Sequence, residues 1–145
     1  MNAEPVLTLI AKTLHECRLE VILVGNAAAA LQGAPVTTLD FDFMFRETPL
    51  HMKKLKKVAR LIQVETGLQL DFMARLHGIK SFESLKSRAV HVSFGGEKLL
   101  VADLQDIIRS KPALGRPKDK AVLKLLEKTQ DEKEKSKPPK PKREA

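Results

Sequence analysis

The segment from Leu39 to Phe45, LDFDFMF, restricts the fold more than any other part of the chain. Apolar residues alternate strictly with the others, and this two-residue period is that of a β-strand with one buried face. Leucine and the phenylalanines face one way, whereas Asp40, Asp42 and Met44 face the other. By strand rise, the Cα atoms of Asp40 and Asp42 are expected to be about 6.5–7 Å apart, close enough for both carboxylates to ligate the same ions. They are either solvent-facing strand positions or ligands of the same ions.

A third acid, Asp71, lies in another apolar strand segment, LQLDFMARL. Three carboxylates that converge from neighbouring strands repel one another strongly unless cations neutralise them. Oxygen-only ligands suit Mg²⁺ or Mn²⁺, and two such ions about 3.5–4 Å apart clamp both oxygens of a phosphoryl displacement. We therefore take Asp40, Asp42 and Asp71 as candidate metal ligands.

The remaining periodicity predicts a mixed sheet with helices around it. A buried strand is expected over 20–24 and a hairpin over 90–101, turning at Gly95-Gly96. Asn26 is expected to cap a small-residue helix that Gly33 stops. Further helices are expected over 5–17, 49–65, 103–109 and 118–129. The buried stripe predicted for the helix over 49–65 consists of Leu50, Leu55, Val58, Leu61 and Ile62.

Length and composition bound the class of protein. The 145 residues suit one domain, expected over 1–127, and the basic Lys/Pro-rich segment 128–145 is expected to be a disordered tail. The net charge is +8, which favours polyanionic partners. A single cysteine, Cys17, excludes an intrachain disulfide framework and a cysteine-built zinc site. No apolar run is long enough for a membrane span, and no secretory signal is evident, so a cytoplasmic location without membrane partners is expected.

Basic residues crowd the helix expected over 49–65. They are His51, Lys53, Lys54, Lys56, Lys57 and Arg60. Such a run is either a solvated helix face or a surface that tracks the phosphates of RNA or DNA with little sequence preference. RNA, such as tRNA, is accordingly a candidate partner through residues 51–60 and the tail.

The order of elements resembles that of a known superfamily. A strand, a Gly turn at Gly25-Asn26, a helix, a DxD strand and a later acidic strand follow one another, as in the nucleotidyltransferase fold. More closely, LVGNAAAALQGAPVTTLDFDFMF is similar to the VGGxAxxxxGxxRxTxDxD stretch of small bacterial nucleotidyltransferase-like proteins related to abortive-infection type IV toxins. Downstream, VADLQDIIRSKPALGRPKDKAVLKLLE is similar to their C-terminal segment. The resemblance spans about residues 20–127 and implies an α+β, polymerase-beta-like fold.

The resemblance implies roles for individual residues. Gly25, Asn26 and Thr38 correspond to nucleotide-binding positions, and Lys111, Arg116 and Asp119 match the C-terminal motif, with Lys111 and Arg116 near the nucleotide. Asp40, Asp42 and Asp71 become the catalytic metal ligands. Two positions depart from the pattern: Asn26 replaces a second Gly or Ser, and Val36 stands where the family has Arg.

The implied function is the metal-dependent transfer of a nucleoside monophosphate from an NTP such as ATP to an acceptor hydroxyl. The expected acceptor is an RNA or tRNA end or a protein, and the chain would be a toxin–antitoxin component with a partner protein. One alternative is a catalytically weakened protein of the same fold that binds nucleotide, nucleic acid or a partner protein without transfer. Another hypothesis is that the chain is a nucleic-acid-binding module that uses the basic helix and the tail.

Overall fold

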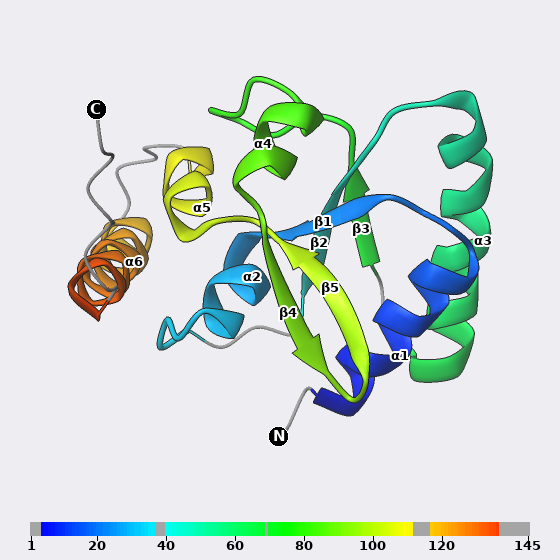
Figure 1. Cartoon of the computed structure of the whole chain (residues 1–145), viewed down its shortest axis with the longest axis horizontal. Helices are drawn as coiled ribbons and strands as arrows, with labels where there is room; N and C mark the ends of the chain where they lie inside the picture. The colour runs from blue at the N-terminus through cyan, green and yellow to red at the C-terminus, as the bar shows by residue number, and fades with distance from the viewer. Residues whose placement is uncertain (1–3, 37–39, 69, 112–116, 137–145) are drawn as a thin grey trace, which may run out of the picture.

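A five-stranded mixed sheet forms the centre of the molecule (Figure 1). The computed structural model describes residues 4–36, 40–68, 70–111 and 117–136. The strands are β1 (Val21–Val24), β2 (Phe41–Phe45), β3 (Leu70–Met73), β4 (Val90–Phe94) and β5 (Glu97–Val101). Their order in the sheet is β3-β2-β1-β5-β4. β1 pairs with β2 and β4 with β5 in antiparallel fashion, whereas β2–β3 and β1–β5 are parallel.

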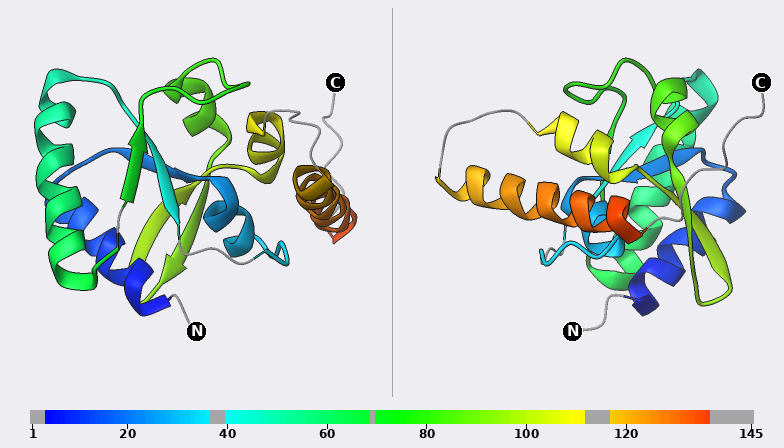
Figure 2. Two further views of the ribbon diagram at one scale, coloured as in Figure 1. Left: turned by 180° about the vertical axis from the view of Figure 1, so that it is seen from behind. Right: turned by 60° about the vertical axis from the view of Figure 1, so that its left-hand side comes forward.

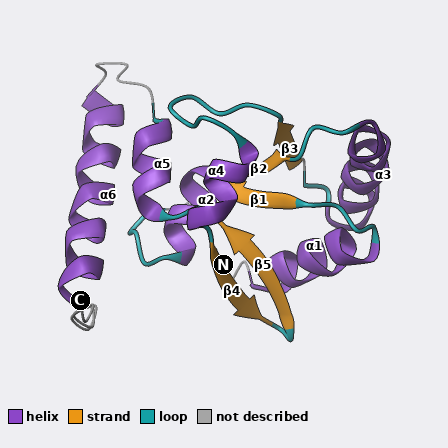
Figure 3. Cartoon of the chain, turned by 45° about the horizontal axis from the view of Figure 1, so that its top comes forward, coloured by secondary structure: helices purple, strands orange, loops and turns teal. Residues whose placement is uncertain are grey.

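Six helices surround the sheet in the described part of the chain. They are α1 (Glu4–Glu16), α2 (Gly25–Leu31), α3 (Pro49–Thr66), α4 (Phe82–Arg88), α5 (Leu104–Ser110) and α6 (Pro117–Ser136). α1 and α3 lie on one side, and α2, α5 and α6 lie on the other (Figures 1 and 3). This confirms the predicted α+β class. Among the described helices, none combines the length and apolar composition needed to cross a bilayer.

The predicted alternation of β2 is confirmed, and it divides the sheet into two faces. Phe41, Phe43 and Phe45 are buried, and the Phe43 ring stacks on Phe72 of β3 with the ring centres 5.6 Å apart. Asp42 points to the opposite face, where it is half-buried. Met44 shares that face and is also buried, because α2 packs against β1 and β2 there. Both faces of the central strands therefore belong to the core, and Asp42 lies at its margin.

α3 begins and ends as its sequence predicts, but its buried stripe is narrower. The Thr48 hydroxyl accepts a hydrogen bond from the His51 amide, and Gly67 ends the helix in the left-handed conformation. Val58 and Ile62 are fully buried, whereas Leu50 and Leu61, which were predicted to be buried, are 59% and 42% exposed. The helix packs mainly against α1 and β3, so only one line of side chains reaches the core.

Other element boundaries differ from the prediction. The sequence analysis missed α4, although Ser81 caps it by accepting a hydrogen bond from the Ser84 amide. β3 covers only Leu70–Met73 of the predicted 68–76 segment, because the chain leaves the sheet after pairing with β2. The β4–β5 hairpin is confirmed, with positive φ at both turn glycines.

The last helix is longer than predicted. α6 continues to Ser136, so residues 128–136, predicted to be disordered, are helical (Figure 2). Thr129 is buried and donates its hydroxyl hydrogen bond to the Leu125 carbonyl, and Lys133 reaches the Gln32 side chain at 2.7 Å. The Lys133–Gln32 contact joins the extra turns to the rest of the domain. Residues 137–145 lie outside the described chain, so the domain boundary at 127 stays a prediction.

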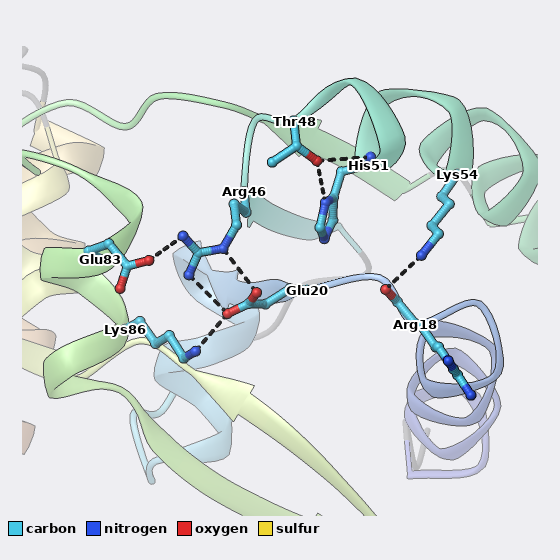
Figure 4. Close-up of polar contacts among 8 residues, drawn as sticks. All are labelled: Arg18, Glu20, Arg46, Thr48, His51, Lys54, Glu83 and Lys86. Carbon is cyan, nitrogen blue, oxygen red and sulfur yellow. Dashed lines mark hydrogen bonds and ion pairs between the residues drawn. The ribbon is translucent and has the colours of Figure 1, made fainter.

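A charged cluster ties the start of β1 to the end of β2 and to α4 (Figure 4). Both Glu20 carboxylate oxygens accept hydrogen bonds from Arg46, at 2.9 and 3.1 Å, and Lys86 donates to Glu20 at 2.7 Å. Arg46 also pairs with Glu83 and lies over the Phe82 ring. The bond to Arg46, assisted by Lys86, lowers the pKa of Glu20 to about 2.

Replacing Glu20 with glutamine should destabilise the protein in a pH-dependent way. The folded pKa lies below the ordinary value of 4.5, so the stabilisation is present above about pH 5 and is lost as the pH falls toward 2. Since the side chain is about a third exposed, we expect a loss of about 1–2 kcal/mol at pH 7. Urea unfolding at pH 7 and pH 3 measures it. The exposed Glu65→Gln is the control, and a deficit that is the same at both pH values would contradict the assignment.

Candidate active site

The junction between β1 and α2 brings the backbone next to the acidic strands. Gly25 has a φ of 71°, in the left-handed region that favours glycine. A Cβ at this position would lie 3.1 Å from the Asp42 Oδ2 atom. The register explains this proximity, because Val24 pairs with Asp42 across the β1–β2 ladder. The glycine thus allows the turn to pass directly beside a carboxylate.

Asn26 binds a lysine from the other end of the domain. The Lys111 Nζ atom, at the end of α5, donates a hydrogen bond to the Asn26 Oδ1 atom at 2.9 Å. The predicted N-cap role of Asn26 is wrong, since α2 begins at Gly25 and has Val24 at its N-cap without a side-chain cap. The Asn26 oxygen instead holds an ammonium group, so the structure brings together two positions that are 85 residues apart.

The acidic strands meet at Asp42 and Asp71, which are directly paired across β2 and β3. Burial raises the pKa of Asp42, and repulsion from the Asp71 and Asp40 carboxylates raises it further. A hydrogen bond with Asp71 acts in the same direction, whereas the Lys111 charge opposes the rise. Asp40 and Asp71 are exposed, so the crowded carboxylates open to solvent on one side. The carboxylates of Asp40 and Asp71 therefore both act electrostatically on Asp42.

The donor chemistry of these acids suits a hard divalent cation. Carboxylate oxygens are the ligands that Mg²⁺ and Mn²⁺ prefer, and a cation would relieve the repulsion that raises the pKa of Asp42. Asp42 and Asp71 would hold this cation, together with Asp40, which directly precedes β2. Yet no group of three or more His, Cys, Asp or Glu side chains in the described ranges is already assembled to hold a metal ion.

The helix that carries Lys111 is fixed by a buried carboxylate that the sequence analysis missed. Asp106 is wholly buried in α5 and pairs with Arg88 at 2.7 Å and with Arg109 at 3.0 Å. The three-residue spacing of Asp106 and Arg109 is a pattern that the sequence shows, because it places both side chains on one side of a helix. The pairing of Asp106 with Arg88 of α4 has no such local pattern. At the other end of α2, Gln32 donates to the Ala102 carbonyl at 2.7 Å. These bonds hold both sides of the Asn26–Lys111 contact.

Some predicted positions fall outside the described chain. Thr38 and Arg116 are among the residues that the structure does not describe, and the same applies to the Asp119 side chain. Val36, which stands where the family pattern has Arg, is described and packs partly buried against the core. It therefore contributes apolar contact to the core at the position where the family pattern has a cation.

Solved structures provide the comparison for this architecture, since no family model and no curated protein matches the sequence. A nucleotidyltransferase-like antigen from Paracoccidioides brasiliensis aligns over 87% of this chain and 74% of its own, with a TM-score of 0.61 and 13% identity. A candidate nucleotidyltransferase from Thermotoga maritima aligns over 88% and 92%, with a TM-score of 0.56 and 21% identity. The chain has the nucleotidyltransferase fold. The antibiotic-resistance factor ANT(2'')-Ia is also similar, over 90% of each chain, with a TM-score of 0.53 and 11% identity.

The structural alignments with the first two of these proteins cover 87% and 88% of this chain. This confirms the nucleotidyltransferase-like fold that the sequence predicts. At these identities the likeness concerns the fold, so the roles of Asp40, Asp42 and Asp71 depend on the geometry of this chain.

Alanine at Gly25 should cost more stability than alanine at a matched glycine. Gly67 has nearly the same φ, 73° against 71°, but a Cβ there meets no atom within 4 Å. Gly67→Ala should lose about 1–2 kcal/mol from left-handed strain alone. Gly25→Ala should lose more, because its methyl group must displace the Asp42 carboxylate. Urea unfolding of both variants measures the difference, and equal losses would contradict the contact.

Asparagine at Asp42 should stabilise the metal-free protein. The raised pKa means that the ionised carboxylate opposes folding at neutral pH, and this cost disappears as the pH falls and Asp42 is protonated. We expect a gain of about 0.5–2 kcal/mol at pH 7 that shrinks at pH 4. Urea unfolding in EDTA measures it, with the exposed Asp131→Asn on α6 as the control. A loss of stability at pH 7 would refute the repulsion.

Proposed function

We propose that this chain transfers a nucleoside monophosphate from an NTP, such as ATP, to an acceptor hydroxyl. The observation that carries the proposal is the repelling Asp42–Asp71 pair beside the Gly25 turn and the Lys111 ammonium. The nucleotidyltransferase fold of the solved neighbours supports the same reaction class. In this reaction the acceptor oxygen bonds to the α-phosphorus, and pyrophosphate leaves with the electrons of the broken bond.

Each residue has a defined part in the proposed reaction. Asp42 and Asp71, with Asp40, would hold Mg²⁺ or Mn²⁺, which when bound polarises the α-phosphate and eases ionisation of the acceptor hydroxyl. Asp71 is exposed and would accept the proton of that hydroxyl. Gly25 lets the phosphates approach the backbone, and Asn26 orients the Lys111 ammonium toward them. The nucleotide-binding roles of Thr38 and Arg116 belong to the same proposal.

The proposed acceptor is an RNA end, such as that of a tRNA. Four exposed basic side chains on α3 support it, together with the basic tail. They are Lys53, Lys56, Lys57 and Arg60. Such a surface binds phosphates without sequence preference and loses affinity as salt rises. A protein hydroxyl is the other acceptor that the assay below detects.

The direct test is incorporation of α-labelled NTPs into total RNA and protein in the presence of Mg²⁺. The wild-type protein should label either RNA or protein. The Asp40→Ala/Asp42→Ala variant should label it at least about a hundredfold more slowly, as expected when transition-state charge stabilisation is removed. Asp131→Ala is the control for a lost acid elsewhere. Calorimetry with Mn²⁺ measures metal binding separately from turnover.

The outcomes separate the candidate functions. Labelling that depends on the aspartates supports the transferase. Nucleotide binding without labelling selects the alternative, a weakened binding protein, for which the apolar Val36 is the relevant departure. No labelling with any NTP and no metal binding would overturn the enzyme. A toxin role with a partner protein that neutralises it would show as growth arrest on expression, relieved by Asp42→Asn.

A further inference from the structure

A groove lies at the end of the sheet away from Gly25, where β1 and β5 separate. The two parallel strands are paired only at Leu23 and Val101. From there they diverge, and the end of α1 lies at the open side of the gap (Figure 1). The resulting groove measures about 470 Å³, which is within the range of small-molecule sites. None of the candidate active-site residues lines it.

The floor of the groove is apolar. Leu14, Leu19, Val21 and Leu99 are buried within it, and Leu100 is half-buried at its side. These side chains come from α1, the turn after α1, β1 and β5, so four segments contribute to the apolar lining. Apolar surface of this kind binds the hydrocarbon or ring portion of a ligand, because its contact with water is then lost.

The rim of the groove is basic. It carries the exposed side chains of His15, Arg18, His91 and Lys98. His15 is paired with Glu97 at 3.0 Å, but no partner of the Arg18, His91 or Lys98 side chain is found among the described residues. The acid on the rim, Glu20, is already neutralised by Arg46 and Lys86. Two cations without a partner among the described residues, Arg18 and Lys98, therefore lie at the edge of the apolar floor.

The backbone at Arg18 is a second notable feature of this groove. Its φ of 51° lies in the left-handed region, where an arginine is strained and glycine is favoured. The Arg18 carbonyl accepts a hydrogen bond from the Lys54 Nζ atom, and the Arg18 side chain points away from Lys54 (Figure 4). The position thus carries an arginine at the edge of the groove, although this backbone conformation favours glycine.

From the apolar floor and the unpaired cations on its rim, we propose that this groove binds a small amphipathic anion. The ligand has an apolar chain or ring, which packs on the apolar floor against Leu100, and one phosphate or carboxylate group. Arg18 and Lys98 bind that group by charge-assisted hydrogen bonds. The site is separate from the proposed nucleotidyl transfer, so its occupancy does not require Asp42.

The test is a titration followed by backbone amide NMR shifts. The probes are octyl phosphate and octanoate, both below their micelle concentrations, and inorganic phosphate. Saturable shifts at residues 14–21 and 98–100 are expected with either amphipathic probe, and the tighter of the two identifies the head group. Inorganic phosphate should bind at least about tenfold more weakly, because it leaves the apolar floor uncovered.

Variants make the assignment specific. Arg18→Gly/Lys98→Gln should weaken octyl phosphate binding by about tenfold or more. Glycine suits the backbone at residue 18, so this variant should keep the fold. The matched control, Lys53→Gln/Lys57→Gln on α3, removes the same charge elsewhere and should bind as wild type does. Asp42→Asn should also bind normally.

Three results would overturn the proposal. They are the absence of saturable shifts in the groove with both amphipathic probes, equal weakening by the α3 control, and inorganic phosphate binding as tight as that of octyl phosphate. Probe binding that is unchanged in the Asp42→Asn variant supports the groove as a separate site. This result does not depend on whether the protein transfers nucleotides.

Discussion

The register between β1 and β2 is the constraint on which the candidate site depends. It places Val24 opposite Asp42, so the turn that begins at Gly25 leaves the sheet directly beside that carboxylate. The parallel pairing of β2 with β3 then sets Asp71 beside Asp42. A slip of one residue in either ladder would turn the acids toward the phenylalanine core, where ionised carboxylates are severely destabilised. The buried phenylalanines of β2 therefore fix the acids on the opposite face.

Charge is distributed unevenly over a chain that is basic overall. The net charge is +8, yet the chain contains a cluster of acids around Asp42. Burial of Asp42 and repulsion by the neighbouring acids raise the pKa of Asp42. Lys111 is the cation that the structure places against this cluster, held by Asn26 and by a helix that the buried Asp106 anchors. At the opposite end of the sheet the situation is reversed, because basic side chains lie at the edge of an apolar groove there. The two ends therefore suit ligands of different chemistry.

Two-residue and helical periodicity in the sequence predicted most of the elements, and local signals such as Thr48 and the Gly95-Gly96 turn fixed several boundaries. Periodicity failed where packing decides. Leu50 and Leu61 have the spacing of buried residues, yet the helix meets too few neighbours to bury them. The extension of α6 to Ser136 is accompanied by a contact between Lys133 and Gln32. That partner is 101 residues away, which no local pattern reveals.

The sequence by itself determined the strand carrying Asp42, which begins one residue after Asp40, the glycine turn after a buried strand, and the order of elements that resembles the nucleotidyltransferase fold. These are properties of local spacing, and a two-residue period is enough to place Asp42 on the face opposite the phenylalanines. Only the tertiary structure decided that Asn26 binds Lys111, that the pKa of Asp42 is raised, and that β1 and β5 separate to form a basic groove. Each of these depends on segments brought together by folding, and long-range contacts of this kind have no signature in the spacing of residues along the chain.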